Sequence, residues 1–411
     1  MTDYQGFYLR ENPFPEVATL DPGSPDPKVN GEIFCEEIVG DEMRDITEKM
    51  NRRVNVIYVA GLEFDKGVGK SALIAHQWRP FAKDGIITTP YIRCKSRNKP
   101  DDFCDLVVRE WAKQGTLWKA FGRLLERYAS ENPSPSLTSE AIQLMLKTFQ
   151  RPPETLPLSR FLHITKPLSL SRSLGEWMNL KEPRVDGKLG EFFSERNLTH
   201  PEAFFDGYVK FKFPGVDRID LYKSILHVLR LGGYQYHYLF LDQFEDSVMP
   251  VSPAGIAGFC LGMRRIIEAS QGLATILVTL HPDSETKLDL PAGGDLVKIA
   301  PVDDIHRVDV GVLEQAGDDA IALAKSYFGR YRTQHAAEPT YPLAADVIRY
   351  ICFLEGVNVR RTLQKLHAVL RHAAEQNVHP LTMEYVKSNH RETMGTELQP
   401  DLLQRFETSS K

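Results

Sequence analysis

The sequence predicts an α/β protein with a parallel sheet flanked by helices, a mainly helical insertion and a C-terminal helical region. Three observations support this fold class. Apolar, strand-like runs alternate with helical patterns, at 54–61, 85–94, 238–241 and 274–279. Such alternation is typical of parallel sheets covered by helices. Prolines and polar residues interrupt the stretch 128–216, and from residue 312 onward the pattern is helical.

The first part of the chain predicts an arm followed by strands and helices. Residues 1–45 are rich in Pro, Asp and Glu, so we expect an irregular arm that lies over a domain and is not a core element. A helix at 41–52 precedes the strand 54–61, and another begins at Ser71 directly after a Gly-rich loop. The stretch 101–114 predicts an amphipathic helix, because its apolar residues fall on one face. Those residues are Phe103, Leu106, Val107 and Trp111.

The second part returns to the α/β pattern and then becomes helical. Leu221 to Leu231 predicts a helix that stops at two glycines, and a helix at 256–269 separates the last two strands. Helices are then expected at 312–332, 342–353, 358–375 and 382–390. These patterns divide the chain into five parts, and one of them, the core, is made of two segments. They are an arm at 1–45, a core made of 46–127 and 217–310, a helical insertion at 128–216, a helical lid at 311–395 and a tail at 396–411.

Composition narrows the class of protein. The 411 residues are enough for two or three domains, and 42% hydrophobic with 26% charged residues predicts a folded chain. The net charge of -5 argues against a polybasic nucleic-acid coat. The five cysteines show no CxxC spacing, which favours a reducing, cytoplasmic setting over a zinc knuckle. We see no signal peptide and no apolar run of the ~20 residues that a membrane helix needs, so no membrane partner is expected.

A Gly-rich loop before a helix predicts a phosphate site. The segment Gly67-Val68-Gly69-Lys70-Ser71-Ala72 follows the strand 54–61. Glycines let backbone N–H groups approach phosphate, and the helix N-terminus adds a favourable dipole. Lys70 would reach the β- and γ-phosphates and the Ser71 hydroxyl would ligate Mg²⁺. The loop departs from the usual spacing, because Phe64 stands where the first glycine of the motif belongs.

A carboxylate at the end of another strand complements this loop. Asp242 closes the apolar run 238–241, where it would hold Mg²⁺ through a water or through Ser71. Gln243 occupies the place of the usual companion Glu. We therefore assign the role of orienting the attacking water to Glu245 rather than Asp246. The alternative is that Glu245 and Asp246 form a solvated helix start.

Two further positions are candidates for contacts with the γ-phosphate. Thr279, at the end of the strand 274–279, is the first candidate for a phosphate sensor, and His281 is the second. Arg360 and Arg361 begin a helix with an apolar stripe in the C-terminal region. Such an arginine can reach from a lid to the phosphates and couple nucleotide state to lid position. We prefer Arg360, and a solvated arginine pair is the alternative.

Taken in order, these motifs resemble the AAA+ ATPases. The order is GVGKS, LFLD, a sensor strand and Asn-Val-Arg-Arg-Thr-Leu in a helical tail. Within that group the chain is most similar to the initiator clade: origin-recognition ATPases, ExeA-like proteins and transposon ATPases. Tyr8 to Phe14 resembles the N-terminal L-x-E-N-P-F segment of ExeA-like proteins. Leu241 to Asp246 also resembles the D-Q-F-E-E box of STAND signalling ATPases.

The resemblance implies a P-loop ATPase fold, ATP and Mg²⁺ as cofactors, and homo-oligomers with ATP at subunit interfaces. By analogy it also implies assembly or remodelling of a nucleic-acid-linked complex in replication, transposition or mobile-element defence, with nucleic acid or a nucleic-acid-bound protein as partner. Two alternatives stay open. One is a STAND-like ATP switch in signalling or defence with little turnover, and the other is a scaffold with a decayed ATP site.

Overall fold

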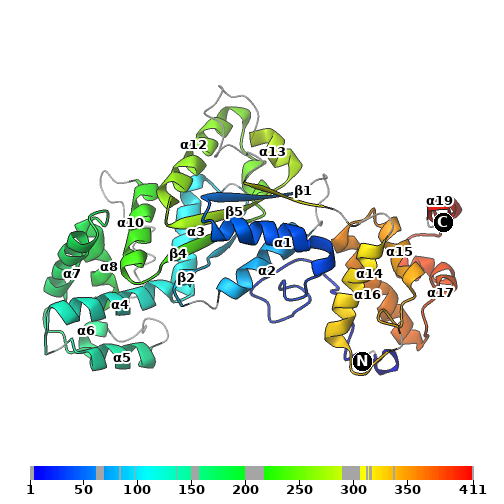
Figure 1. The fold of residues 1–411 in the computed structure, drawn as a ribbon, viewed down its shortest axis with the longest axis horizontal. Coiled ribbons are helices and arrows are strands. Elements are labelled where there is room, and N and C mark those ends of the chain that lie inside the picture. The colour runs from blue at the N-terminus through cyan, green and yellow to red at the C-terminus, as the bar shows by residue number, and fades with distance from the viewer. Residues whose placement is uncertain are drawn as a thin grey trace.

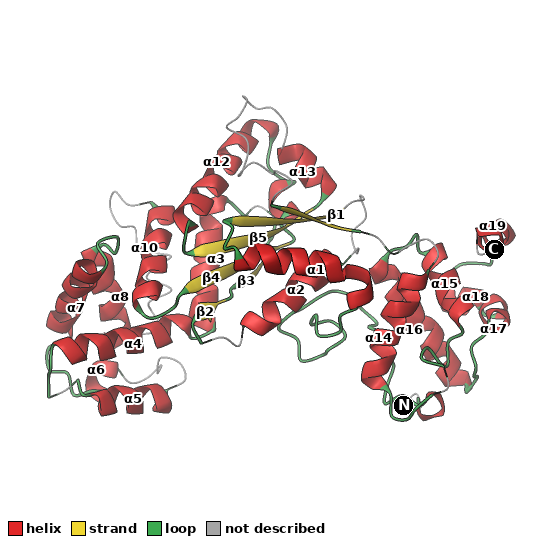
Figure 2. Cartoon of the chain, viewed as in Figure 1, coloured by secondary structure: helices red, strands yellow, loops and turns green. Residues whose placement is uncertain are grey.

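A computed structural model gives the fold of this chain (Figure 1). The structure describes residues 4–61, 69–82, 85–96, 98–135, 137–149, 157–199, 217–288, 306–311, 313, 317–336 and 338–409. It is an α/β fold in which a parallel sheet lies between two groups of helices (Figure 2). The fold class expected from the alternating pattern is therefore confirmed at this level.

Within the described residues the sheet has six strands, and every pairing between them is parallel. They are β1 Val56–Gly61, β2 Ile87–Thr88, β3 Tyr91–Arg93, β4 Tyr236–Asp242, β5 Ala274–Leu280 and β6 Arg307–Val310. The order is β2-β4-β5-β1-β6, and β3 also pairs with β4. Each residue of β1, β4 and β5 is buried, which explains their continuous apolar runs. Because β5 lies between β1 and β4, three strands end side by side at one edge of the sheet.

Helices cover both faces of the sheet. Tyr236, Tyr238 and Phe240 of β4 pack in one buried cluster with residues of α1 and α2. The alternate residues Leu239 and Leu241 pack in the larger cluster on the opposite face. The helices of this half of the molecule are α1 Glu36–Asn51, α2 Lys70–Phe81, α3 Pro100–Lys113, α4 Thr116–Glu131, α10 Arg218–Leu231, α11 Glu245–Val248, α12 Pro253–Ser270 and α13 Pro282–Leu288.

The predicted insertion is helical where the structure describes it. Its helices are α5 Ser139–Thr148, α6 Leu158–Phe161, α7 Pro167–Lys181 and α8 Gly187–Thr199. Helices α7 and α8 pack closely, since a Cβ on Gly175 would lie 2.5 Å from the carbonyl oxygen of Gly187. Phe192 and Phe193 are buried in the main core, so the aromatic residues described here serve packing. Phe204 to Phe213 lie outside the described residues.

The C-terminal helices form a core of their own. They are α14 Asp318–Tyr331, α15 Ala345–Leu354, α16 Val359–Gln376, α17 Met383–Ser388, α18 His390–Met394 and α19 Pro400–Ser409. The stripe expected on α16 is buried in this core, at Leu363, Leu366, Val369 and Leu370. Figure 1 shows these helices beyond the end of the sheet opposite to α7 and α8. None of the described helices combines the length and apolarity needed to cross a membrane.

The N-terminal arm differs from its prediction. Apart from the short 3-10 helix η1 Gln5–Phe7 it is irregular up to residue 35, but it does contribute to a core. Phe7, Leu9 and Phe14 are buried among the C-terminal helices. The Phe14 ring lies 5.7 Å from that of Tyr327 and 5.2 Å from that of Phe328. The prolines that suggest a surface arm prevent regular structure, but they do not prevent the apolar side chains between them from being buried.

Other differences concern strand and helix boundaries. The expected strand 85–94 is two short strands, β2 and β3, separated at Thr89-Pro90, and proline cannot donate a ladder hydrogen bond. Strand β6 and helices α4, α13 and α19 were not predicted, and α19 lies in the segment assigned to the tail. Helix α1 begins at Glu36 instead of residue 41, inside the segment assigned to the arm.

Candidate functional site

The N-terminus of α2 presents the residues expected to bind phosphate. Gly69 is the N-cap, with φ 110°, and α2 begins at Lys70. That backbone conformation favours glycine over any residue with a Cβ. The N–H groups of the first turn have no partner within a helix and point out of its N-terminus together with the positive end of its dipole. Gly69, Lys70, Ser71 and Ala72 all line one pocket, while Gly67 and Val68 lie outside the described residues.

Asp242 lies opposite that helix start, at the end of β4. Its side chain is 3% exposed. The Ser71 hydroxyl donates to Asp242 Oδ1 at 2.7 Å, although the two residues are 171 positions apart. The N–H of Gln243 donates to the same oxygen at 2.9 Å. The structure thus brings together the two residues assigned to Mg²⁺.

Thr279 lies beside this pair at the end of β5. Its hydroxyl is 3.4 Å from Asp242 Oδ1, and the side chain is 1% exposed. His281, the second sensor candidate, has a different environment: its N–H donates to Ser284 Oγ at 3.1 Å and its ring is 3.5 Å from Asp283. The geometry therefore favours Thr279 over His281 as the sensor candidate, because its hydroxyl lies near Asp242 Oδ1, the oxygen that also accepts the Ser71 hydrogen bond.

Strand β3 contributes a residue that the sequence analysis missed. The Tyr91 hydroxyl donates to Asp242 Oδ2 at 2.8 Å. Burial and the adjacent carboxylate raise the pKa of Tyr91 well above its ordinary value, so the hydroxyl remains a donor. The signal lies in the register, because Tyr91 pairs with Phe240 and Arg93 with Asp242. Strand periodicity alone does not fix that register.

The residues after Asp242 turn sharply. Gln243 has φ 55°, in the left-handed region, which costs a non-glycine residue roughly 1 kcal/mol or more. Its side-chain oxygen accepts a hydrogen bond from Arg93 Nε at 2.8 Å. The turn then leads into α11, whose first residue, Glu245, lines the same pocket as Lys70 and Ser71.

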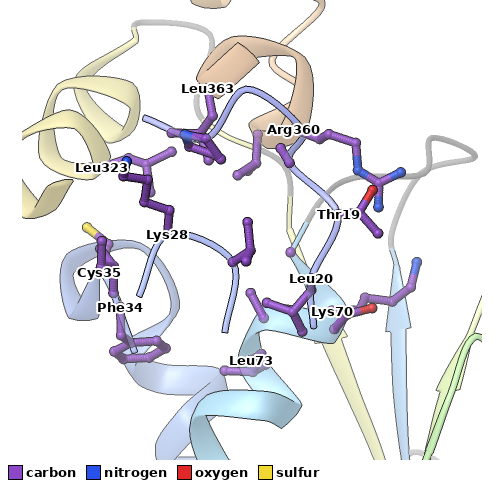
Figure 3. Close-up of a pocket in the computed structure, with 18 of the residues that line it drawn as sticks. Thr19, Leu20, Lys28, Phe34, Cys35, Lys70, Leu73, Leu323, Arg360 and Leu363 are labelled. Atoms are coloured by element: carbon purple, nitrogen blue, oxygen red, sulfur yellow. The ribbon is translucent and has the colours of Figure 1, made fainter. Parts of the chain in front are cut away.

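That pocket extends from the end of the sheet to the C-terminal helices (Figure 3). Figure 3 shows Lys70 and Arg360 on one side and Phe34, Cys35 and Leu323 on the other. The polar side also includes Ser71, Gln243 and Glu245. The wider apolar side comes from the arm, α1, α2, α14 and α16, and includes Leu20, Val29, Ile33, Phe34, Ile38, Leu73, Leu323 and Leu363.

Arg360 belongs to the first turn of α16. Asn358 caps this helix by accepting a hydrogen bond from the Arg361 N–H at 3.1 Å. Arg360 lines the pocket, whereas Arg361 is exposed and is not part of the lining. The preference for Arg360 thus agrees with the placement of the two side chains.

Three other arginines, Arg264, Arg265 and Arg307, each bind a carboxylate within the chain. Arg264 contacts Glu268 at 2.9 Å, Arg307 contacts Asp309 at 2.6 Å, and Arg265 pairs with Asp217. None of the three lines the pocket described above.

The donor set at Asp242 suits Mg²⁺ bound together with a ligand. Among the described residues there is no group of three or more His, Cys, Asp or Glu side chains able to hold a metal ion. Mg²⁺ is often bound by one or two protein oxygens, with water and substrate phosphates completing its octahedron. One carboxylate and one hydroxyl, Asp242 and Ser71, fit that pattern.

Comparison of the chain with protein-family models, with curated proteins and with solved structures found no match. The site is therefore interpreted from its own residues and from the resemblance of its motifs.

Proposed function

We propose that this protein binds Mg-ATP in the manner of an AAA+ P-loop ATPase. The hydrogen bond between Ser71 and Asp242 is the observation that carries the proposal. Each residue was selected from a separate motif, one for its place after a Gly-rich loop and the other for its place after an apolar strand. Their contact at 2.7 Å places both side chains close enough to hold one Mg²⁺.

The shape of the pocket supports a nucleotide as the ligand. The triphosphate would lie against the N-terminus of α2, between Lys70 and Arg360 on the polar side of the pocket. The base would occupy the apolar side, between Leu20 of the arm and Leu323 and Leu363 of the C-terminal helices. A ligand with one highly charged end and one aromatic end matches a pocket of this composition.

The chain's own residues have distinct roles in this proposal. Bound Mg²⁺ would neutralise charge on the β- and γ-phosphates. Ser71 and Asp242 would hold that ion, and Thr279 would sense the γ-phosphate from the neighbouring strand. Glu245 would orient the attacking water and Arg360 would stabilise charge on the phosphates, so that catalysis rests on positioning.

The larger biological role in this proposal rests on the family resemblance. The protein would form homo-oligomers with ATP between neighbouring subunits. It would use ATP to assemble or remodel a nucleic-acid-linked complex, in replication, transposition or mobile-element defence.

A specific observation favours a second candidate, an ATP switch with little turnover. The position after Asp242 carries an amide, and Arg93 holds that side chain. Gln243 therefore offers no carboxylate to activate water. Slow hydrolysis at Glu245 would then let the bound state persist and signal through assembly.

Nucleotide binding and turnover by the Lys70→Ala variant test the proposal. We expect the variant to lose ATP binding, while Lys113→Ala, on the exposed surface of α3, behaves like the wild type. Unchanged ATP binding by Lys70→Ala would exclude the assignment. For the wild type, turnover that rises with DNA supports the remodelling ATPase. Tight binding with little turnover, together with Mg-ATP-dependent oligomers, supports the switch.

A further inference from the structure

Both oxygens of the Asp242 carboxylate have hydrogen-bond partners, and these come from different elements. Oδ1 accepts the Ser71 hydroxyl at 2.7 Å and the Gln243 N–H at 2.9 Å. Oδ2 accepts the Tyr91 hydroxyl at 2.8 Å. A carboxylate bound through both oxygens cannot rotate freely about its Cβ–Cγ bond, so Tyr91 fixes the plane in which the remaining lone pairs lie.

The Tyr91 ring is itself held from two sides. It stacks on Phe240 of β4, with ring centroids 6.3 Å apart and planes at 20°. The Trp78 ring of α2 meets its edge with centroids 6.2 Å apart. Trp78 is fixed in turn, because its indole N–H donates to the carbonyl of Thr89 at 2.7 Å. The hydroxyl therefore has little freedom to move away from Asp242.

The backbone also connects the two residues. Tyr91 pairs with Phe240, two positions before Asp242 on the neighbouring strand. One residue beyond β3, the N–H of Cys94 donates to the Asp242 carbonyl at 2.8 Å. The segment 91–94 thus holds both the main chain and the side chain of Asp242. Ser71, in contrast, belongs to α2, whose N-terminus is the proposed phosphate site.

We propose that Tyr91 is a positioning residue that orients the Asp242 carboxylate toward Mg²⁺, and this rests on the proposed function. In the Mg-bound state the Ser71 oxygen would donate a lone pair to the ion while its proton stays directed at Asp242 Oδ1. Tyr91 holds the other oxygen throughout. Partners of this kind set the geometry of a metal ligand without touching the metal.

The test is the Mg²⁺ dependence of ATP binding by the Tyr91→Phe variant. Phenylalanine keeps the ring between Trp78 and Phe240 and removes only the hydroxyl, and thermal unfolding checks that the fold is retained. We expect the Mg²⁺ concentration for half-maximal binding of a fluorescent ATP analogue to rise about 10- to 100-fold. Binding in EDTA should equal that of the wild type, because the phosphate contacts of Lys70 are unchanged.

Tyr222→Phe is the matched control. It removes a hydroxyl that lies 3.1 Å from Ser270 Oγ in the core on the opposite face of the sheet, away from Asp242, and should leave the Mg²⁺ dependence unchanged. An unaltered Mg²⁺ profile for Tyr91→Phe would overturn the proposal. So would an equal loss of ATP binding in Mg²⁺ and in EDTA, which a merely structural role predicts. If Lys70→Ala binds ATP normally, the proposed function fails, and the role of Tyr91 fails with it.

Discussion

The two sides of the pocket are built in different ways. The polar side includes the start of α2 and the turn after β4, and partly buried hydrogen bonds connect its Ser71 to Asp242 and Asp242 to Tyr91. The apolar side is assembled from the arm and four helices, and Leu20, Leu323 and Leu363 come from parts of the chain far apart in the sequence. A rigid sheet edge can fix charges to a fraction of an ångström. A wall shared between the arm, the helices next to the sheet and the C-terminal helices can change with their relative position, and therefore suits coupling of ligand to movement.

Contacts between the arm and the helices sharpen this contrast. Asn12 donates to the carbonyl of His367 at 3.0 Å, which fixes the arm to α16. Glu32 contacts Arg79 of α2 at 3.4 Å and also pairs with Arg330 of α14. These ion pairs are partly exposed, so each contributes at most about 1 kcal/mol. The arm thus connects the helix that begins at Lys70 to the C-terminal helices through several weak contacts.

The largest expected effect is at the polar side, in Lys70→Ala. Two unit charges 4 Å apart near a protein surface interact by about 4 kcal/mol, which corresponds to a loss of roughly 1,000-fold in affinity. Because this contact is made to phosphate alone, the variant should lose ATP and inorganic tripolyphosphate alike. Competition binding measures both ligands. Loss of ATP with tripolyphosphate binding retained would show that Lys70 does not contact the phosphates.

The next effect concerns chemistry without binding, in Glu245→Gln. Removing a general base lowers turnover by about 10²- to 10⁴-fold, and ATP affinity should remain within the error of the measurement. Single-turnover hydrolysis separates the two quantities. The control is Asp246→Asn, the next residue on α11, for which normal turnover is expected. Equal turnover in Glu245→Gln and wild type would remove Glu245 from the mechanism.

A smaller effect is expected on the apolar side, in Leu20→Ala. Shortening a half-buried leucine removes roughly 1 to 2 kcal/mol of apolar contact, or about a tenfold loss in affinity. Only ATP should be affected, since tripolyphosphate has no base to place there. Val17→Ala, on an exposed part of the same arm, is the control. A proportional loss of both ligands would mean that the two sides of the pocket do not act separately.

Acid should weaken the sheet that carries the polar side. Burial lowers the pKa of His237, on β4, to about 3. A histidine in the unfolded chain has a pKa of about 6.5. Between these values the unfolded chain binds more protons, so stability is present above pH of about 6.5 and is lost as the pH falls. The contribution of His237 to this slope of stability against pH is about 1.4 kcal/mol per pH unit. Urea unfolding followed from pH 7 to pH 4 measures it, and His237→Gln should show a shallower slope.

How much of this site the sequence predicts depends on how local each feature is. The helix start at Lys70 and the strand before Asp242 follow from apolar runs and a Gly-rich turn, which need no tertiary information. The Ser71–Asp242 contact follows once the strand before the Gly-rich loop and the strand before Asp242 are placed in one parallel sheet, because the carboxyl ends of parallel strands meet at one edge. The helices of the C-terminal region up to residue 390 were likewise predicted from their spacing, whereas α19 was not.

The rest depends on contacts between distant segments. Tyr91 was assigned only to a strand, since its hydroxyl finds Asp242 through a register that the alternation pattern leaves open. Burial of Phe14 among the C-terminal helices was missed because proline-rich segments are expected on surfaces. The short strand β6 follows residues 289–305, which lie outside the described part of the chain, and its few residues carry a weak periodic signal.

The most direct test of the account is a double-mutant cycle on Ser71 and Asp242. ATP affinity is measured in Mg²⁺ and in EDTA for the wild type, Ser71→Ala, Asp242→Asn and the double variant. If both residues hold one Mg²⁺, ATP affinity falls only when Mg²⁺ is present. The double variant then loses little more affinity than the single variant that binds ATP more weakly. Additive losses, or equal losses with and without Mg²⁺, would contradict a shared metal site.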